Sequence, residues 1–456
     1  MHPQREQAGH FARRTFLKAG SISTGGLLLP QLLQAEDRVR SHEPTAKSCI
    51  LLYMLGGPAQ HETFDMKPEA AVGIRGEFSP IATAVPGLHV CEHLPRLARL
   101  AQHYTVIRSV HHDATFHGAG VHYNLTGWEP TPRAGQPMLD RRDPPSIGGV
   151  VEYFEGKRTG LPASVQLPMW ITQDGPGNEW AGQHAGFLGP THDPLLMDFK
   201  GDRPGNLPRD FVPNQVNQGG RLGERVNLLR AIQAREQIGM TSGQQRWRFF
   251  QQGAMDVLNA SSSWQSFCIE EESPTTREQY GDHHFGRSCL VARRLVEAGV
   301  RLVTVVWPIT QATPHFDTHA NHFPAMKDQL LPPMDQGIAA LLEDLHSRGL
   351  LDETLVACAG EFGRTPQIDS NPKGGGRHHW GPVYSTLLAG GGVRGGSVYG
   401  QSDKRGAVPA DDPVHVSDWV ATIYHALGYG RDTRVVDFNG RPHYIVRGQP
   451  VRSLLL

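Results

Sequence analysis

Apolar residues recur along this chain in two alternating patterns. Short continuous apolar runs predict strands that are buried on both faces of a sheet, and they cover residues 49–55, 104–110, 301–307, 354–359 and 384–389. Other stretches place apolar residues on one face of a helix, as in Met334, Ile338, Leu341, Leu342 and Leu345. Further helices are predicted near 94–100, 288–298 and 416–427. This alternation predicts an α/β fold with a doubly wound, mostly parallel central sheet and helices on both faces.

The chain divides into a leader and one α/β domain. Residues 1–35 are predicted to be a signal peptide, because the run from Arg13 to Lys18 matches the twin-arginine export pattern and a weakly apolar segment follows. The alternative is a chance basic pair before a frayed helix. Residues 46–456 carry the strand and helix pattern. Within them, 160–275 is rich in loops and then in Arg and Gln, so we interpret it as a cap or insertion over the site.

Export by the twin-arginine machinery predicts a periplasmic or extracellular destination. No other run approaches the ~18 apolar residues that span a membrane, so no transmembrane segment is expected. With 44 basic and 45 acidic residues, the formal net charge is −1, which argues against nucleic acid as a partner. The 5 Cys lack paired spacing, which favours buried free thiols over a disulfide framework and leaves one bridge open.

Side chains that bind metals follow the predicted strands. Ligands of open α/β sheets bind at the carboxyl ends of the strands. The loops after 301–307 and 354–359, and the glycine run beyond the second loop, contain Asp317, His319, His322, Glu361, His378 and His379. Carboxylates with imidazoles suit a divalent metal. We therefore predict one or two ions of Zn, Mn, Fe or Ca, with these six residues as ligands. The alternative for Asp317 is a turn that it caps, with solvated histidines beside it.

The loop after the first strand adds two candidate ligands. His61 and Asp65 both follow the run 49–55. Asp65 suits a metal site but equally suits a packed turn.

Three residues are candidates for catalysis. His117 lies in a histidine-rich loop, where it is the candidate proton donor. Thr115 is the hydroxyl nearest the middle of this loop and the candidate nucleophile, although a lone loop Thr is more often a turn residue. Arg364 is predicted either to clamp an anion bidentately or to pair with Glu361.

Several motifs together resemble the domain-of-unknown-function 1501 family over nearly all of the chain after the leader. They are the twin-arginine leader, Gly-Gly-Pro-Ala-Gln-His-Glu-Thr-Phe-Asp (56–65), Phe-Asp-Thr-His-Ala-Asn (316–321), Gly-Glu-Phe-Gly-Arg-Thr-Pro (360–366) and Gly-Arg-His-His-Trp (376–380). By fold this family is similar to alkaline phosphatases and sulfatases. The resemblance implies a metal-type site at the carboxyl ends of the strands, with Asp317, Glu361 and His378/His379 in the order of the superfamily's ligands.

The chain also departs from the superfamily pattern. Superfamily hydrolases carry Asp at the end of the first strand, where this chain has Leu55-Gly56-Gly57, and Asp-His where it has Glu361-Phe362. No Ser or Thr nucleophile is recognisable at a helix start, and Cys91–Arg96 lacks the spacing of the C-x-P-x-R sulfatase maturation pattern. These departures argue against a formylglycine sulfatase. They also leave the two-metal site incomplete, with one ion or none.

Two functions follow from these patterns. The first is an exported metal-dependent hydrolase of phosphate or sulfate esters, acting on small molecules or glycans. The alternative is a catalytically inactive alkaline phosphatase-like binding or scaffold protein of the cell envelope. The convergence of polar residues on one sheet edge favours the hydrolase.

Overall fold

A central sheet organises the residues that the computed structural model describes, which are 42–130, 137–156, 161–172, 178–197, 228, 267–309, 314–371 and 373–456. Within these ranges the strand order is β12-β4-β11-β8-β1-β7-β5-β6, and β15 also pairs with β4. The strands are β1 (Ser48–Tyr53), β4 (Tyr104–His111), β5 (Ser164–Leu167), β6 (Leu195–Leu196), β7 (Leu302–Val306), β8 (Thr354–Ala359), β11 (Tyr384–Ala389), β12 (Ser397–Tyr399) and β15 (Val414–His415).

Parallel pairing dominates this sheet. β1 lies between β7 and β8 and runs parallel to both, with Leu52 opposite Val305 and Cys358. β5 pairs in parallel with β6 and β7, whereas β11 runs antiparallel to β4 and β8. Every residue of β1, β7 and β8 is buried, which explains why these strands appear as unbroken apolar runs. The predicted α/β fold with a mostly parallel sheet is confirmed.

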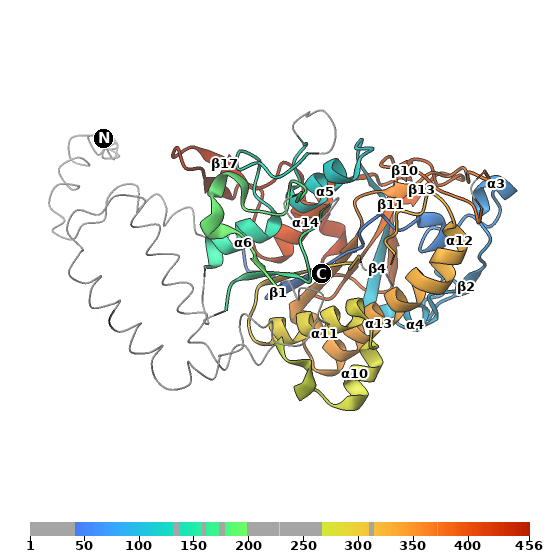
Figure 1. Ribbon diagram of the computed structural model, residues 1–456, viewed down its shortest axis with the longest axis horizontal. Coiled ribbons are helices and arrows are strands. Elements are labelled where there is room, and N and C mark those ends of the chain that lie inside the picture. Colours follow the sequence, from blue (N-terminus) through green and yellow to red (C-terminus); the bar gives the residue numbers. More distant parts are fainter. Residues whose placement is uncertain are drawn as a thin grey trace, which may run out of the picture. The chain divides into compact units, whose positions relative to one another are not determined.

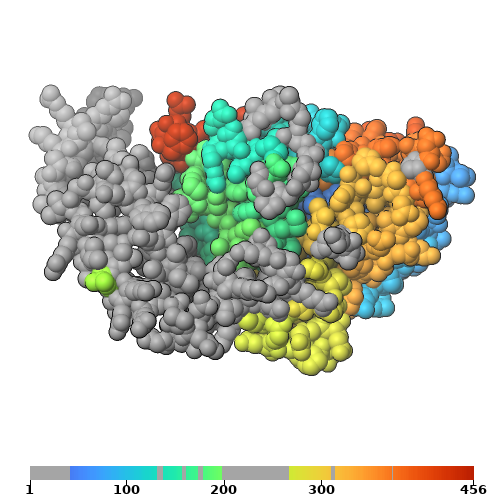
Figure 2. All heavy atoms as spheres, viewed as in Figure 1, coloured from blue at the N-terminus to red at the C-terminus, as the bar shows by residue number. Residues whose placement is uncertain are grey.

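Helices cover both faces of the sheet (Figure 1). α4, α10, α11 and α13 lie on one side, and α5, α6 and α14 lie on the other. Their bounds are α4 (Pro95–Arg99), α5 (His117–Thr126), α6 (Ile147–Glu155), α10 (Pro274–Tyr280), α11 (His284–Glu297), α13 (Leu331–Ser347) and α14 (Val416–Ala426). The apolar positions predicted for α13, from Met334 to Leu345, are buried. Figure 2 shows the outer surfaces of α10 and α11 in yellow and of α13 in orange.

Short elements connect these layers. The helices α3 (Val72–Arg75) and α12 (His322–Ala325) lie in loops that follow β1 and β7. The remaining short strands form hairpin-like pairs, which are β2 (Pro80–Ala82) with β3 (His89–Cys91), β9 (Gly363–Arg364) with β10 (His379–Trp380), β13 (Gln401–Ser402) with β14 (Pro409–Asp411), and β16 (Arg434–Val436) with β17 (Pro442–Tyr444).

The segment 160–275 differs at its start from the predicted cap. Its first strands, β5 and β6, pair into the central sheet next to β7. The beginning of the segment therefore belongs to the α/β core, because every residue of β5 is buried, and the two leucines of β6 are half-buried beside it. Most of its remainder, 198–227 and 229–266, lies outside the described residues, as does the predicted signal peptide at 1–35.

Two further predictions concern membrane spans and cysteines. Within the described ranges, no helix is both long and apolar enough to cross a membrane. Cys49, Cys91, Cys289 and Cys358 are free and buried, as predicted. Burial raises the pKa of the Cys49 and Cys358 thiols, so both stay protonated at neutral pH.

Candidate metal-binding site

Two glycines directly after β1 allow three loops to meet at the carboxyl end of the sheet. Gly56 has a φ of 100°, and a Cβ there would lie 2.4 Å from the backbone nitrogen of Asp317. Gly57 has a φ of 73°, and its Cβ would lie 2.5 Å from the carbonyl oxygen of Phe362. Any side chain at either position would displace the loops that follow β7 and β8.

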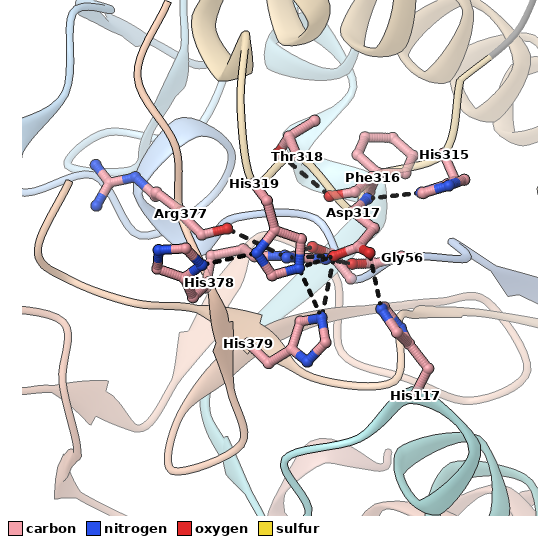
Figure 3. A network of polar contacts seen from close by, with 12 residues as sticks. Gly56, His117, His315, Phe316, Asp317, Thr318, His319, Arg377, His378 and His379 are labelled. Atoms are coloured by element: carbon pink, nitrogen blue, oxygen red, sulfur yellow. Dashed lines mark hydrogen bonds and ion pairs between the residues drawn. The ribbon is translucent and has the colours of Figure 1, made fainter. Parts of the chain in front are cut away.

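Asp317 is the centre of a polar cluster at this edge (Figure 3). Its Oδ1 lies 2.7 Å from Arg364 Nη1, 2.8 Å from His319 Nε2 and 3.1 Å from His379 Nε2. Its Oδ2 lies 3.1 Å from Nε2 of His117, the first residue of α5. Burial works to raise the pKa of Asp317, but hydrogen bonds with the three imidazoles and the charge of Arg364 lower it far below its ordinary value. Asp317 is therefore ionised.

His117 connects Asp317 to the buried side chain of Glu361. Its Nδ1 lies 2.5 Å from Glu361 Oε1, which also accepts a hydrogen bond of 2.8 Å from the Gly56 amide. A carboxylate oxygen accepts, so Nδ1 donates to Glu361, and in the absence of a cation Nε2 also carries a proton and donates to Asp317. A divalent cation would displace the Nε2 proton and leave the Nδ1 proton in place. Burial works to lower the pKa of His117, but hydrogen bonds to Asp317 and Glu361 outweigh it and raise the pKa to about 9.

His379 is held in a similar way. Its Nδ1 lies 2.8 Å from the carbonyl oxygen of Thr115, which can only accept, so Nδ1 carries the proton of the neutral ring. Its Nε2 then faces Asp317 Oδ1 and lies 3.0 Å from His319 Nε2. A lone pair that faces a carboxylate is repelled unless a cation lies near both.

Three ligand atoms of this cluster meet at one place. His117, Asp317 and His379 each offer one atom, and these atoms lie within 4.8 Å of one another. The Oε2 atom of Glu361 is buried and has no hydrogen-bond partner among the described residues. Imidazoles that bind a metal usually donate their second N–H to a carboxylate or a carbonyl oxygen, as both rings do here. The residues therefore fit a divalent cation held by two imidazoles and one carboxylate.

The structure brings five of the predicted ligands to this edge, which are Asp317, His319, Glu361, His378 and His379. His319 Nδ1 lies 2.7 Å from His378 Nδ1, and these two side chains are 40% and 49% exposed. Both are thus more open to solvent than His379, which is 20% exposed. Glu361 reaches the cluster through His117, so its contacts suit orienting that ring.

The other three predicted ligands make different contacts. His322 is buried, with its ring nitrogens 3.0 Å from Glu62 Oε2 and 2.6 Å from Thr318 Oγ1. His61 Nε2 donates to a backbone carbonyl oxygen at 2.8 Å. Asp65 is buried, and its Oδ1 lies 2.9 Å from Lys67 Nζ. This contact agrees with the alternative prediction of a packed turn. The chain turns away after β1, so lying close to a strand end in sequence does not bring these side chains to Asp317.

Two predicted catalytic residues also make contacts other than those expected. Arg364 is fully buried, and it pairs with Asp317 rather than with Glu361. The other hydrogen bonds of its guanidinium go to three backbone carbonyl oxygens, and Cζ lies 5.6 Å from the centroid of the Phe362 ring. The guanidinium is therefore not presented to an outside anion. Thr115 is exposed and meets His379 through its carbonyl oxygen. Thr115 therefore contacts the site through its backbone and not through its hydroxyl.

A cavity of about 280 Å³ lies beside the cluster. It is lined by Leu55, Gly56, His117, Thr172, Trp180, Ile309, His315 and Asp317. The Trp180 indole stacks on the His117 ring, with centroids 5.6 Å apart and planes inclined by 12°. Sequence reasoning missed Trp180, because a lone aromatic residue in a loop-rich segment has no periodicity to mark it.

Comparison with solved structures finds proteins of similar fold at low identity. The PsFucS1 sulfatase from Pseudoalteromonas sp. is 11% identical, with 87% of this chain and 72% of that chain covered and a TM-score of 0.39. The phosphonate monoester hydrolase SpPMH from Silicibacter pomeroyi is 12% identical, with 89% of this chain and 76% of that chain covered and a TM-score of 0.36. The alkaline phosphatase from the Antarctic bacterium TAB5 is 14% identical, with 78% of this chain and 95% of that chain covered and a TM-score of 0.36. A search of curated proteins found no match.

A family model covers nearly the whole described chain. It is described as "Protein of unknown function (DUF1501)" and matches residues 46–455. The match includes every strand of the central sheet and every residue of the Asp317 cluster. The chain therefore belongs to the DUF1501 family.

Proposed function

We propose that this protein is an exported, metal-dependent hydrolase of phosphate or sulfate esters. The observation that carries the proposal is the convergence of His117, Asp317 and His379, whose ligand atoms lie within 4.8 Å of one another. Two imidazoles and a carboxylate leave a coordination position open in a tetrahedral metal site, as catalytic sites require. Zinc is the ion that this donor set suits best, with Mn, Fe or Ca as alternatives.

The side chains around the ligands would prepare them for the ion. Glu361 and the Thr115 carbonyl oxygen keep the protons on Nδ1 of His117 and His379, so that both Nε2 atoms are available. Asp317 stays ionised and supplies negative charge towards the ion. A bound divalent cation would polarise an ester oxygen and lower the pKa of a bound water.

The ester would bind between the exposed imidazoles and the cavity. His319 and His378 are partly open to solvent. Their ring nitrogens contact each other, Asp317, His379 and Asp369, so their N–H groups would donate to phosphate or sulfate oxygens by exchanging one of these contacts. The cavity of about 280 Å³ beside Asp317 would hold the rest of the substrate. This volume is near the low end of the roughly 300–1,000 Å³ of ligand pockets, and Trp180 offers an aromatic wall. A small ester, or one ring of a glycan, fits both properties.

Export by the twin-arginine pathway is part of the proposal. It is supported by the run from Arg13 to Lys18. A protein whose ligands come from loops after several different strands forms its metal site only once it has folded. Export in the folded state would deliver that site intact to the periplasm or beyond.

The second candidate is an inactive alkaline phosphatase-like binding or scaffold protein of the cell envelope. One observation favours it, because α5 begins beside Asp317 with His117 rather than with a Ser or Thr nucleophile. Such a protein would still bind the cation and an anionic glycan. It would not turn over an ester.

Metal content and turnover distinguish the candidates. We expect natively exported protein to contain stoichiometric metal by mass spectrometry and to hydrolyse p-nitrophenyl phosphate or sulfate, with both properties lost in His379→Ala. Metal without turnover of either ester, or of sulfated and phosphorylated sugars, supports the binding protein. Folded wild-type protein that takes up no zinc, manganese, iron or calcium contradicts the hydrolase.

A further inference from the structure

A buried carboxylate, Glu62, contacts two of the three segments that carry imidazoles of the Asp317 cluster. It lies in the short 3-10 helix η1 (Gln60–Glu62), which follows the glycine turn after β1. We propose that Glu62 is a positioning residue that fixes the loop of His319 relative to the loop of His378 and His379. The inference rests on the proposed function, since it concerns the geometry of the same site.

The first arm runs through Arg377. This arginine is fully buried, and its Nη2 and Nε donate to Glu62 Oε1 at 2.7 and 3.2 Å. The other hydrogen bonds of its guanidinium go to backbone carbonyl oxygens of three residues. Its backbone N–H donates to the Thr318 carbonyl oxygen at 3.2 Å, which also joins the two loops directly. Arg377 directly precedes His378 and His379 in the chain. Holding its guanidinium in place therefore fixes the start of the segment that carries both imidazoles.

The second arm runs through His322. Its Nε2 lies 3.0 Å from Glu62 Oε2, and its Nδ1 lies 2.6 Å from Thr318 Oγ1. Thr318 stands between Asp317 and His319 in the loop after β7. The two oxygens of one carboxylate thus serve one loop each. This divided arrangement is the basis for assigning a positioning role to Glu62.

The packing around Glu62 leaves its carboxylate little freedom. A Cβ on Gly76, which has a φ of 76°, would lie 2.5 Å from Glu62 Oε1. Removing the negative charge would leave Arg377 buried without its anionic partner, which costs far more than an exposed pair. The segments held by the two arms should respond before the strands behind them, because the sheet does not depend on this contact.

The test compares Glu62→Gln with the matched control Asp335→Asn. Asp335 is also buried, and its carboxylate accepts backbone hydrogen bonds of 2.9 and 2.8 Å from α4. For each protein we would measure zinc affinity by competition with a chromophoric chelator. Hydrogen–deuterium exchange of the zinc-free proteins would report on residues 317–323 and 374–380.

We expect Glu62→Gln to weaken zinc binding about 10–100-fold and to accelerate exchange in both segments, whereas exchange in β8 should accelerate only as far as the global free energy of unfolding falls. Asp335→Asn should change neither property. If Glu62→Gln does not fold, Thr318→Val cuts the second arm alone and should accelerate exchange more in 317–323 than in 374–380, whose Arg377 amide donates to the Thr318 carbonyl oxygen. Wild-type exchange in both segments of Glu62→Gln, or in 317–323 of Thr318→Val, overturns the inference. If wild-type protein binds no zinc, the proposed function fails, and exchange alone decides the role of Glu62.

Discussion

Asp317 and Glu62 each face an arginine and at least one histidine, yet only one of these carboxylates has a complete set of partners. Glu62 is fully buried, and its two oxygens receive Arg377 on one side and His322 on the other. One negative charge is matched there by one guanidinium, and each neighbouring donor has an acceptor. All of these polar groups have partners within the protein, so we infer that the Glu62 group supports the structure and does not bind a ligand itself.

The Asp317 group has too many acceptors for its donors. Asp317 is 19% exposed and meets three imidazoles as well as Arg364. One of those rings, His379, gives its neutral-form proton to a carbonyl oxygen, and Glu361 Oε2 has no partner in the described part of the chain. A divalent cation would remove this mismatch. The difference between the two groups shows that a buried carboxylate whose partners are all present has a structural role. A group with more acceptors than donors is instead suited to bind a cation.

Asp317→Asn should produce the largest difference between the two groups. The change keeps the shape of the side chain but removes a metal ligand and its charge. We expect zinc affinity, measured by calorimetry, to fall by more than about 100-fold, beyond the range typical for residues that only orient ligands. His322→Asn, which changes the Glu62 group, should lower zinc affinity by a smaller factor. An equal loss of zinc affinity in both variants would contradict different roles for the Asp317 and Glu62 groups.

The free energy of unfolding should fall more when Glu62 is replaced than when Asp317 is replaced, which is the opposite order from zinc affinity. Glu62→Gln leaves buried Arg377 without its counter-charge, and breaking a buried pair in this way costs about 3–5 kcal/mol. Asp317→Asn also leaves a buried arginine, Arg364, without its carboxylate, but Asp317 is 19% exposed, so water can partly replace the lost charge and we expect a smaller cost. Denaturant unfolding of the zinc-free proteins measures both values. A larger loss for Asp317→Asn would mean that its cluster is mainly structural.

Acid should weaken both groups through one buried histidine beside each. Burial lowers the pKa of His112, which contacts the Glu361 carbonyl oxygen, and of His61, next to Glu62, to about 4 in each case. Unfolded histidine titrates near 6.5, so between these pH values the unfolded state binds more protons. These two rings therefore make stability fall below about pH 6.5, by roughly 1.4 kcal/mol per pH unit for each ring. His117, whose pKa is raised to about 9, acts in the opposite sense and makes stability fall as the pH rises from about 6.5 to 9.

Unfolding of zinc-free protein between pH 7 and pH 4 checks this slope. His112→Gln should flatten it, since the amide can still donate to a carbonyl oxygen and does not titrate. Stability that rises on acidification would contradict neutral, buried rings at these positions.

Much of the fold could be predicted because its strands are buried on both faces. β1, β7 and β8 consist entirely of buried residues, so their apolar runs stand out and their ends point to Asp317 and Glu361. The antiparallel direction of β11 could not be predicted, because a strand has the same apolar pattern in either direction. The beginning of 160–275 was assigned to a cap for a related reason, since β5 is short and surrounded by loops.

The site was harder to predict, because the end of a predicted strand indicates which residues follow it in sequence. It does not indicate in which direction the loop then carries their side chains. Asp65 and His61 follow β1 as closely as Asp317 follows β7, yet η1 directs them to other partners. Glu62 and Arg377 lie inside motifs that resemble the family, but their 2.7 Å contact joins residues far apart in sequence. Only the fold reveals that pairing.

Replacing Trp180 should have the smallest effect, and it tests whether the Asp317 side of the comparison binds an organic group as well as an ion. Trp180 lines the cavity and stacks on His117, so Trp180→Ala removes an aromatic contact worth about 0.5–1.5 kcal/mol. We expect KM for a sulfated or phosphorylated monosaccharide to rise about 2–10-fold, with kcat and zinc affinity little changed. Trp170→Ala is the matched control, because Trp170 packs against His184 instead, with centroids 4.3 Å apart and planes inclined by 31°. An unchanged KM in Trp180→Ala would show that the cavity does not hold the sugar, and the ester would then have to bind through the ion and the exposed imidazoles alone.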